Sequence, residues 1–262
     1  MKKLICYFTV LILIFSSCNS NPEQENQNVP VGFLKRFTVS GMTGFVNYDY
    51  YYEGNKISKV VSKHGIKRYT YTGNLITEIR EFNRNLSLVS KKTFQYNAND
   101  ELISSVLLFY DNNYGTKQEL VYNSDGTVLV KYYSGNLTSQ NNFDYSVLNY
   151  FENNEIIKTE ATFSFGDLIT TYEYDSGNNP MSQVVGYNKL NILGELADGF
   201  YFMLHNGNQN NCTKRIQEGN NIDCEVVDYG ITYNSANYPI FYCSNDQITS
   251  CSDLPCYGFV YQ

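Results

Sequence analysis

Short apolar runs, many of them rich in tyrosine, alternate along this chain with two-residue turn signals. The signals are Gly-Asn, Gly-Asp or Asp-Gly dipeptides at 54–55, 73–74, 125–126, 135–136 and 166–167. Such dipeptides accept the positive φ that tight hairpin turns need. The pattern predicts an all-β fold, a long antiparallel meander of repeated hairpins. From the turn spacing we expect roughly 14 strands of ordinary length, in a curved sheet that closes into a barrel-like shell.

Alternation within the runs supports this interpretation. Between residues 156 and 165, apolar residues occupy odd-numbered positions and polar residues occupy even-numbered ones. The apolar residues are Ile157, Ala161, Phe163 and Phe165, and the polar residues are Lys158, Glu160, Thr162 and Ser164. That is one buried and one wet face of a strand. The run 102–110 is apolar on both parities, so we expect it to be covered on both sides. Residues 190–196, with leucine at every third position, are the helix candidate.

The hairpins repeat a recognisable core that begins with tyrosine. The leading tyrosines are Tyr52, Tyr71, Tyr96, Tyr122, Tyr150 and Tyr174, at gaps of 19 to 28 residues. Each gap is long enough for two strands and two turns. Self-similarity of this length indicates a repeat architecture in which neighbouring units stabilise each other.

The N-terminus has the pattern of an export signal. Lys2 and Lys3 precede an apolar run over 4–15, which is too short for a permanent transmembrane helix. Ser16, Ser17 and Cys18 follow and match a bacterial lipobox, with an ordinary secretory signal as the alternative.

We therefore predict three parts of the chain and a cellular location. Residues 1–17 form a lipoprotein signal peptide, 18–32 a flexible tether lipidated at Cys18, and 33–262 a single β-repeat domain with a cysteine-containing C-terminal segment. The lipid would hold the protein in the cell envelope, at the outer membrane, on its periplasmic or surface face.

Charge narrows the choice of partners. The formal net charge of the full chain is −7, and loss of the signal removes two lysines and no acid, leaving −9. An acidic chain without a basic stripe argues against nucleic acid and anionic lipid headgroups as partners. The expected partners are the membrane, through the N-terminal lipid, and an envelope protein or a glycan.

Five cysteines gather near the C-terminus, and they are Cys212, Cys224, Cys243, Cys251 and Cys256. In an exported chain disulfides are the default, and an odd number leaves one thiol over. The guessed pairing joins Cys243 to Cys251 or Cys256, and Cys212 to Cys224. Zinc is the rival interpretation, although no Cys-x-x-Cys pair occurs.

Catalytic signals are missing from the sequence. No metalloprotease, nucleophile-elbow or phosphate-loop motif occurs, and neither His64 nor His205 stands in a known local pattern. Acidic turns such as 97–101 offer too few oxygens for calcium, and Asp and Asn suit turns for backbone reasons alone. We predict no enzyme activity, no catalytic or metal-binding residues and no cofactor.

The repeat cores and three later motifs resemble known families. Tyr-x-x-Asp/Asn-Gly cores resemble the YD-type repeats of Rhs-like proteins. The segments 172–180, 206–214 and 231–241 follow in the order of a family of bacteroidete lipoproteins of unknown function. That resemblance implies a porin-like β fold and supplies no catalytic residues. Asn237 replaces the glycine that is usual in the third motif, which affects only the geometry of that turn.

Three functional hypotheses stay open. The first is a lipid-anchored envelope β-repeat protein with a binding or scaffolding role. The second is a surface glycan- or nutrient-binding lipoprotein of an uptake system, and the third is an envelope enzyme with an unrecognised site. The 25 tyrosines could stack on sugar rings, but no cluster of them stands out in the sequence.

Overall fold

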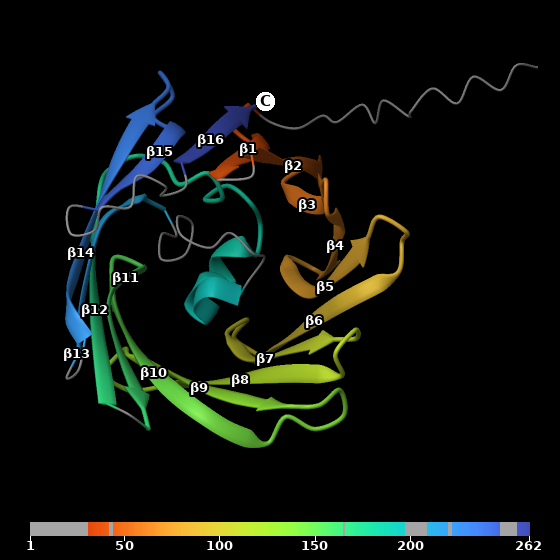
Figure 1. Ribbon diagram of the computed structural model, residues 1–262, viewed down its shortest axis with the longest axis vertical. Coiled ribbons are helices and arrows are strands. Elements are labelled where there is room, and N and C mark those ends of the chain that lie inside the picture. The colour runs from red at the N-terminus through yellow and green to blue at the C-terminus, as the bar shows by residue number, and fades with distance from the viewer. Residues whose placement is uncertain (1–30, 42–43, 165, 197–208, 220–221, 247–255) are drawn as a thin grey trace, which may run out of the picture.

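The computed structural model describes residues 31–41, 44–164, 166–196, 209–219, 222–246 and 256–262. These residues form one closed antiparallel barrel of sixteen strands (Figure 1). Each strand pairs with the strands that precede and follow it in sequence, and the pairing of β1 with β16 closes the barrel. The predicted meander and its closure are confirmed. The prediction of roughly 14 strands is low by two because several hairpins, such as β5–β6 and β7–β8, lack the dipeptide signal.

The bounds of the strands follow the turn signals closely in the first two thirds of the chain. The strands are β1 (Leu34–Gly41), β2 (Gly44–Glu53), β3 (Lys56–Ser62), β4 (Gly65–Thr72), β5 (Leu75–Asn83), β6 (Leu88–Tyr96), β7 (Leu102–Phe109), β8 (Tyr114–Tyr122), β9 (Val128–Gly135), β10 (Asn142–Glu152), β11 (Glu155–Phe163), β12 (Gly166–Tyr174), β13 (Cys212–Gly219), β14 (Ile222–Tyr233), β15 (Pro239–Asp246) and β16 (Cys256–Tyr261).

The repeated tyrosine has a structural role, which is to link each hairpin to the one before it. Tyr96 donates its hydroxyl to the carbonyl of Ile76 at 2.8 Å, and Tyr122 donates to that of Leu102 at 3.1 Å. Eight side-chain-to-backbone bonds run around the wall, made by Tyr52, Tyr71, Tyr96, Tyr122, Asn149, Tyr174, Tyr242 and Tyr261. Seven of them donate to a backbone carbonyl, whereas the hydroxyl of Tyr71 accepts from the N–H of Ile57 at 3.2 Å. We call this set the tyrosine ring. Burial raises the pKa of Tyr71 and Tyr122 to about 12.

In the β10–β11 hairpin, the predicted repeat places its leading residue one position too early, at Tyr150 instead of Phe151. A β-bulge shifts the register between Tyr150 and Phe151, so Phe151 pairs with Ile156 as the other repeat tyrosines pair with theirs. Tyr150 instead donates to the outward Glu160 carboxylate at 2.8 Å. Because phenylalanine has no hydroxyl, Asn149 supplies the ring's bond by donating to the carbonyl of Val128 at 3.2 Å.

Because of the same bulge, the predicted division of β11 into a buried and an exposed face is wrong at its start. Ile156 is buried and Ile157 is only half-buried, because the bulge inserts a residue and reverses the alternation there. Ala161 is buried as predicted, and Phe165 lies outside the described residues. The prediction that 102–110 is covered on both sides is wrong, since β7 lies in a single wall and Ile103 is 37% exposed.

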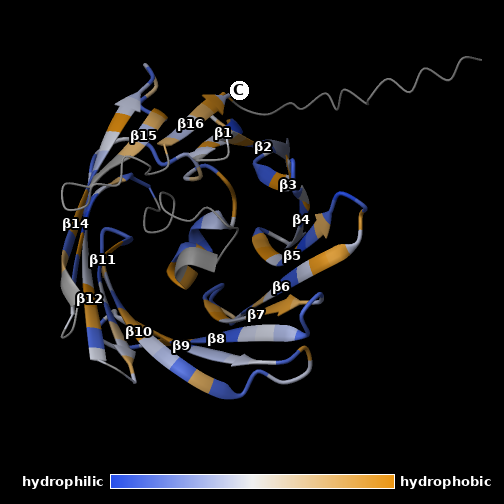
Figure 2. Cartoon of the chain, in the orientation of Figure 1, coloured by the Kyte–Doolittle hydropathy of each residue, from blue (hydrophilic) through white to orange (hydrophobic). Residues whose placement is uncertain are grey.

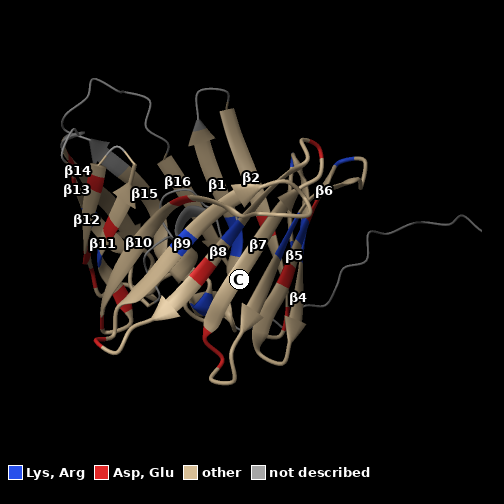
Figure 3. Ribbon diagram, turned by 90° about the horizontal axis from the view of Figure 1, so that it is seen from below, with Lys and Arg blue, Asp and Glu red and all other residues tan. Residues whose placement is uncertain are grey.

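Charged residues occur on many strands of the wall (Figure 3), and several of them form ion pairs on its outer face. On β8, Lys117 and Glu119 form an ion pair at 2.9 Å, while Gln118 between them is buried inside. On β11, Lys158 and Glu160 pair at 2.5 Å. Further pairs of this kind are Arg36–Asp49, Glu78–Arg80 and Glu173–Lys214. The middle of the outer wall therefore carries paired charges on strands around the circumference.

The chain between β12 and β13 turns into the barrel. It contains the 3₁₀ helices η1 (Tyr187–Lys189) and η2 (Asn191–Leu196), which lie inside the ring of strands (Figures 1 and 2). The predicted helix candidate at 190–196 thus takes the tighter 3₁₀ form. Residues 175–196 are called the internal segment below. No helix among the described residues is long and apolar enough to cross a membrane.

Candidate functional site

The internal segment fills part of the barrel with apolar side chains. Its buried hydrophobic residues, each 3% exposed or less, are Met181, Val184, Tyr187, Leu190 and Leu193. They belong to one core with inward side chains of the wall, among them Ile76 and Leu102. Full burial of a side chain of this size contributes about 1.5–3 kcal/mol. The lumen at this level is a packed core.

Polar contacts fix the inner end of the segment. Gln118, buried on β8, donates to the carbonyl of Leu193 at 3.0 Å and accepts from Ser105 at 2.7 Å. Gly186, at φ +76°, passes so close to the β4–β5 turn that a Cβ would lie 2.6 Å from the carbonyl oxygen of Asn74. The wall therefore contacts the internal segment closely both at Leu193 and at Gly186.

The three motifs that carried the family resemblance meet where this segment leaves and rejoins the wall. Asp175, from the first motif, accepts from the backbone N–H of Asn211 at 3.1 Å and from the hydroxyl of Tyr233. Asn237 has φ +63°, so the left-handed turn is kept although glycine is absent, and its amide donates to the carbonyl of Ser176 at 3.0 Å. These motifs hold the internal segment in place.

Glu155, at the start of β11, adds a buried carboxylate to this anchor. It is 5% exposed, and one of its oxygens accepts from the backbone N–H groups of Gln209 and Asn210 at 2.8 and 2.9 Å. Removing the carboxylate would leave two backbone donors without this acceptor.

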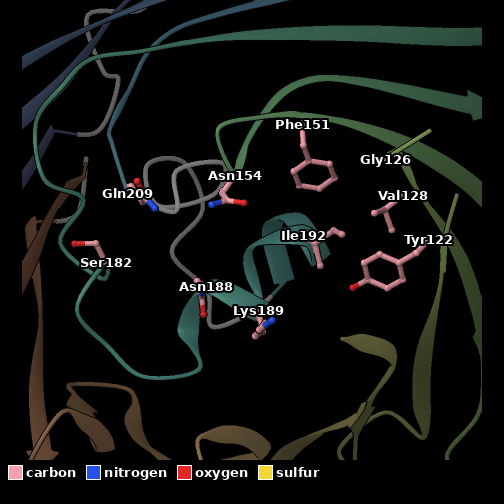
Figure 4. A pocket seen from close by; sticks show the side chains of 10 residues that line it. All are labelled: Tyr122, Gly126, Val128, Phe151, Asn154, Ser182, Asn188, Lys189, Ile192 and Gln209. Atoms are coloured by element: carbon pink, nitrogen blue, oxygen red, sulfur yellow. The ribbon is translucent and has the colours of Figure 1, made fainter. Parts of the chain in front are cut away.

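A pocket of about 480 Å³ lies at the rim between the internal segment and the wall of β8 to β11 (Figure 4). Its lining residues are Tyr122, Gly126, Val128, Phe151, Asn154, Ser182, Asn188, Lys189, Ile192 and Gln209. Rings from β8 and β10 and the side chain of Ile192 face the same space, with amides around them. The volume lies in the range of small-molecule sites.

The chemistry of the pocket is apolar at the wall and polar at the edge. Lys189 is the one charged residue among its ten lining residues, and none of them is His, Cys, Asp or Glu. The titratable groups of the lining are Lys189 and Tyr122, and it has no carboxylate, thiol or imidazole to act beside them in acid–base or nucleophilic chemistry. It offers ring faces, hydroxyl groups and carboxamides, which suit binding of an uncharged polar molecule.

The cysteine predictions meet different outcomes. Cys243 and Cys256 form a disulfide that joins β15 to β16, as one of the two guessed alternatives. The guessed Cys212–Cys224 bridge is wrong: both are free, and they lie toward opposite ends of the β13–β14 pair. Burial raises the pKa of the Cys212 thiol to about 12, so that thiol stays protonated at neutral pH. Cys18 and Cys251 lie outside the described residues.

The remaining candidate groups do not come together in the part of the chain that the structure describes. His64 is exposed in the β3–β4 turn, and His205 lies outside the described residues. Among those described, no three His, Cys, Asp or Glu side chains are grouped so that they could hold a metal ion.

Fold and site together define a class of protein: a closed sixteen-stranded barrel, filled in part by its own chain, with a pocket at the rim. No protein-family model and no curated protein matches the sequence. Among solved structures, the chain is similar to a porin-like protein from Bacteroides vulgatus, with a TM-score of 0.59 and 14% identity over 88% of this chain and 98% of that one.

A second porin-like protein, from Bacteroides uniformis, gives a TM-score of 0.55 and 10% identity over 91% of this chain and its own full length. At these identities the likeness is one of fold. It confirms the porin-like β fold that the sequence resemblance implied.

Sequence reasoning missed the pocket. Its aromatic residue on β10 is Phe151, which the repeat alignment placed one position away from its true role. Asn188 and Lys189 belong to the stretch 181–189, which follows the first motif and carries no repeat or motif of its own. The sequence offers a phenylalanine directly after Tyr150, but its meaning is clear only from the structure, where a bulge just before the repeat tyrosine recurs in the β2–β3, β4–β5 and β6–β7 hairpins.

Proposed function

We propose that this protein is a lipid-anchored barrel of the cell envelope that binds a small ligand at its rim pocket and conducts nothing through its lumen. One observation carries the proposal: the internal segment packs Leu190 and Leu193 against the inner wall, and a pocket remains beside it. An unfilled barrel of 16–18 strands would leave an aqueous channel. Here that space is used for packing, which favours binding over transport.

The charged outer surface of the wall favours a barrel that is surrounded by water and is attached to the membrane by a separate anchor. A membrane-spanning barrel presents an outward apolar band about 25 Å tall. Here Lys117–Glu119 and Lys158–Glu160 pairs occupy outward positions within their strands. Burying such charges in hydrocarbon would cost about 2–4 kcal/mol for each lysine near the bilayer midplane. Attachment through a lipid on Cys18 is consistent with such a wall.

Catalysis has no support in the pocket, whose lining lacks carboxylates, thiols and imidazoles. We therefore propose a binding role without enzyme activity and without a cofactor. Residues 19–262 contain all sixteen strands and the internal segment, so they are the appropriate material for binding experiments.

The binding role is tested by thermal unfolding against a panel of chemically distinct compounds: disaccharides, dipeptides, nucleosides and medium-chain fatty acids. A ligand at a hundredfold excess over its Kd stabilises by about 2.7 kcal/mol, which is roughly 5–10 °C for a domain of this size. Asn188→Trp, which puts a bulky side chain into the pocket from an exposed position, should abolish the shift. If no compound class shifts the parent protein, the binding proposal is wrong.

The anchor is tested separately by labelling cells with a radioactive fatty acid. The full chain should incorporate the label, and Cys18→Ser should not. Equal labelling of the two would show that Cys18 is not the lipidated residue.

A further inference from the structure

We propose that the rim pocket takes an uncharged disaccharide unit, stacked on the rings of Phe151 and Tyr122. This inference rests on the binding role proposed above and names the ligand class of the same pocket. Its basis is the combination of two ring faces with an edge of carboxamide and hydroxyl groups around a space of about 480 Å³.

The two rings form a platform on alternate strands. Tyr122 ends β8, Phe151 lies near the end of β10, and Val128 of β9 stands between them. Neighbouring strands are 4.7–4.9 Å apart, so the two backbones are separated by roughly 10 Å. That span suits two consecutive sugar rings, each with an apolar C–H face on an aromatic face.

The absence of a hydroxyl at Phe151 fits this use. In the tyrosine ring, the residue at this position would direct a hydroxyl toward the carbonyl of Val128, but Asn149 makes that bond instead. Phe151 therefore contributes a ring without a polar tip. Tyr122 keeps its hydroxyl bonded to Leu102, so its ring is held at a fixed place while the residue stays 39% exposed.

The edge of the pocket matches hydroxyl groups better than it matches charges. Asn188, Gln209 and Asn154 carry carboxamides, which both donate and accept hydrogen bonds, and each sugar hydroxyl also does both. A phosphate would call for several cations or a bidentate arginine, and Lys189 is the single cation present. A fatty acid would make no use of the hydrogen-bonding groups at this edge.

The charge of the pocket should also discriminate between neutral and cationic sugars. With Lys189 at the edge and no carboxylate in the lining, an amino sugar with a free ammonium group would meet a like charge and no counter-charge. The pocket should therefore prefer neutral disaccharides over cationic ones of the same shape.

The test is calorimetric titration of residues 19–262 with cellobiose, maltose, cationic chitobiose and the dipeptide Gly-Leu. We expect at least one neutral disaccharide to bind, with chitobiose and Gly-Leu weaker by tenfold or more. Phe151→Leu keeps an apolar side chain but removes the ring face, and should weaken disaccharide binding roughly three- to tenfold. Asn188→Ala should weaken it by a similar factor.

One variant controls for general destabilisation. Tyr96→Leu removes a tyrosine from the equivalent position on β6, away from the pocket. It should bind disaccharide as the parent does, measured below its unfolding temperature. Equal loss in Tyr96→Leu and Phe151→Leu would overturn the stacking model.

The failures of the two proposals can be told apart. If Gly-Leu or a nucleoside binds the parent but not Asn188→Trp, while neutral disaccharides do not bind, the pocket is a binding site and the saccharide inference is wrong. If no compound binds, both proposals fall.

Discussion

The packing of the internal segment inside the barrel can be tested by removing its side chains. Leu190 and Leu193 are 0% and 1% exposed and come from a segment with no strand partners of its own. We expect Leu190→Ala and Leu193→Ala, each made singly, to destabilise the protein strongly. The two residues are three positions apart and share neighbours, so the double variant should lose less than the sum.

The magnitude follows from burial. Truncating a fully buried leucine to alanine costs about 2–5 kcal/mol, depending on how far the surroundings collapse into the cavity. Neither substitution removes the bond from Gln118 to the backbone carbonyl of Leu193, so the loss comes from packing alone. Against a typical total of about 5–15 kcal/mol, either loss is a large fraction.

Urea unfolding followed by circular dichroism measures this loss. With a slope of about 2 kcal/mol per molar urea, the midpoint should fall by about 1–2.5 M. Val121→Ala is the control, because Val121 lies on the same strand as Gln118 and is 45% exposed. It should change the free energy of unfolding by about 0.5 kcal/mol or less. A Leu190→Ala variant as stable as Val121→Ala would refute a packed lumen.

Three further predictions concern the wall. Tyr96→Phe removes one bond of the tyrosine ring and should cost about 0.5–1.5 kcal/mol in urea unfolding, whereas Tyr114→Phe, at an exposed tyrosine, should be neutral. Replacing Cys243 and Cys256 together by serine should cost about 3 kcal/mol by the loop-entropy estimate, and a variant as stable as the parent under oxidising conditions would contradict the bridge. Burial raises the pKa of ring tyrosines such as Tyr122 from 10.0 to about 12, so stability should be complete below pH 10 and fall between pH 10 and 12; a flat stability profile across that window would disprove this.

The repeat made the wall predictable from sequence. Gly-Asn and Asp-Gly turns set the hairpins, and tyrosines such as Tyr52 and Tyr96 marked the unit that the ring then links by hydrogen bonds. A closed antiparallel barrel needs little beyond local pairing, so the local signals were sufficient. They failed where a bulge moved the alternation, at Ile157, because the extra residue has no sequence mark of its own.

The site was less predictable because it depends on contacts between distant segments. Asp175 meets Asn211 and Tyr233 only after the chain has passed into the barrel and returned. The pocket likewise combines Phe151 of the wall with Asn188 of the internal segment. The predicted Cys212–Cys224 bridge failed for a similar reason: the register of β13 against β14 places the two cysteines apart, and spacing in sequence does not reveal that register.

Sedimentation velocity of residues 19–262, with and without detergent, tests most directly whether the outer wall of this barrel faces water. The account predicts the same single species in plain buffer and in buffer with micelles, with no bound detergent, because outward pairs such as Lys117–Glu119 keep the wall hydrated. A protein that aggregates in buffer, and disperses only with a detergent belt around it, would show that the wall faces lipid and would contradict the account.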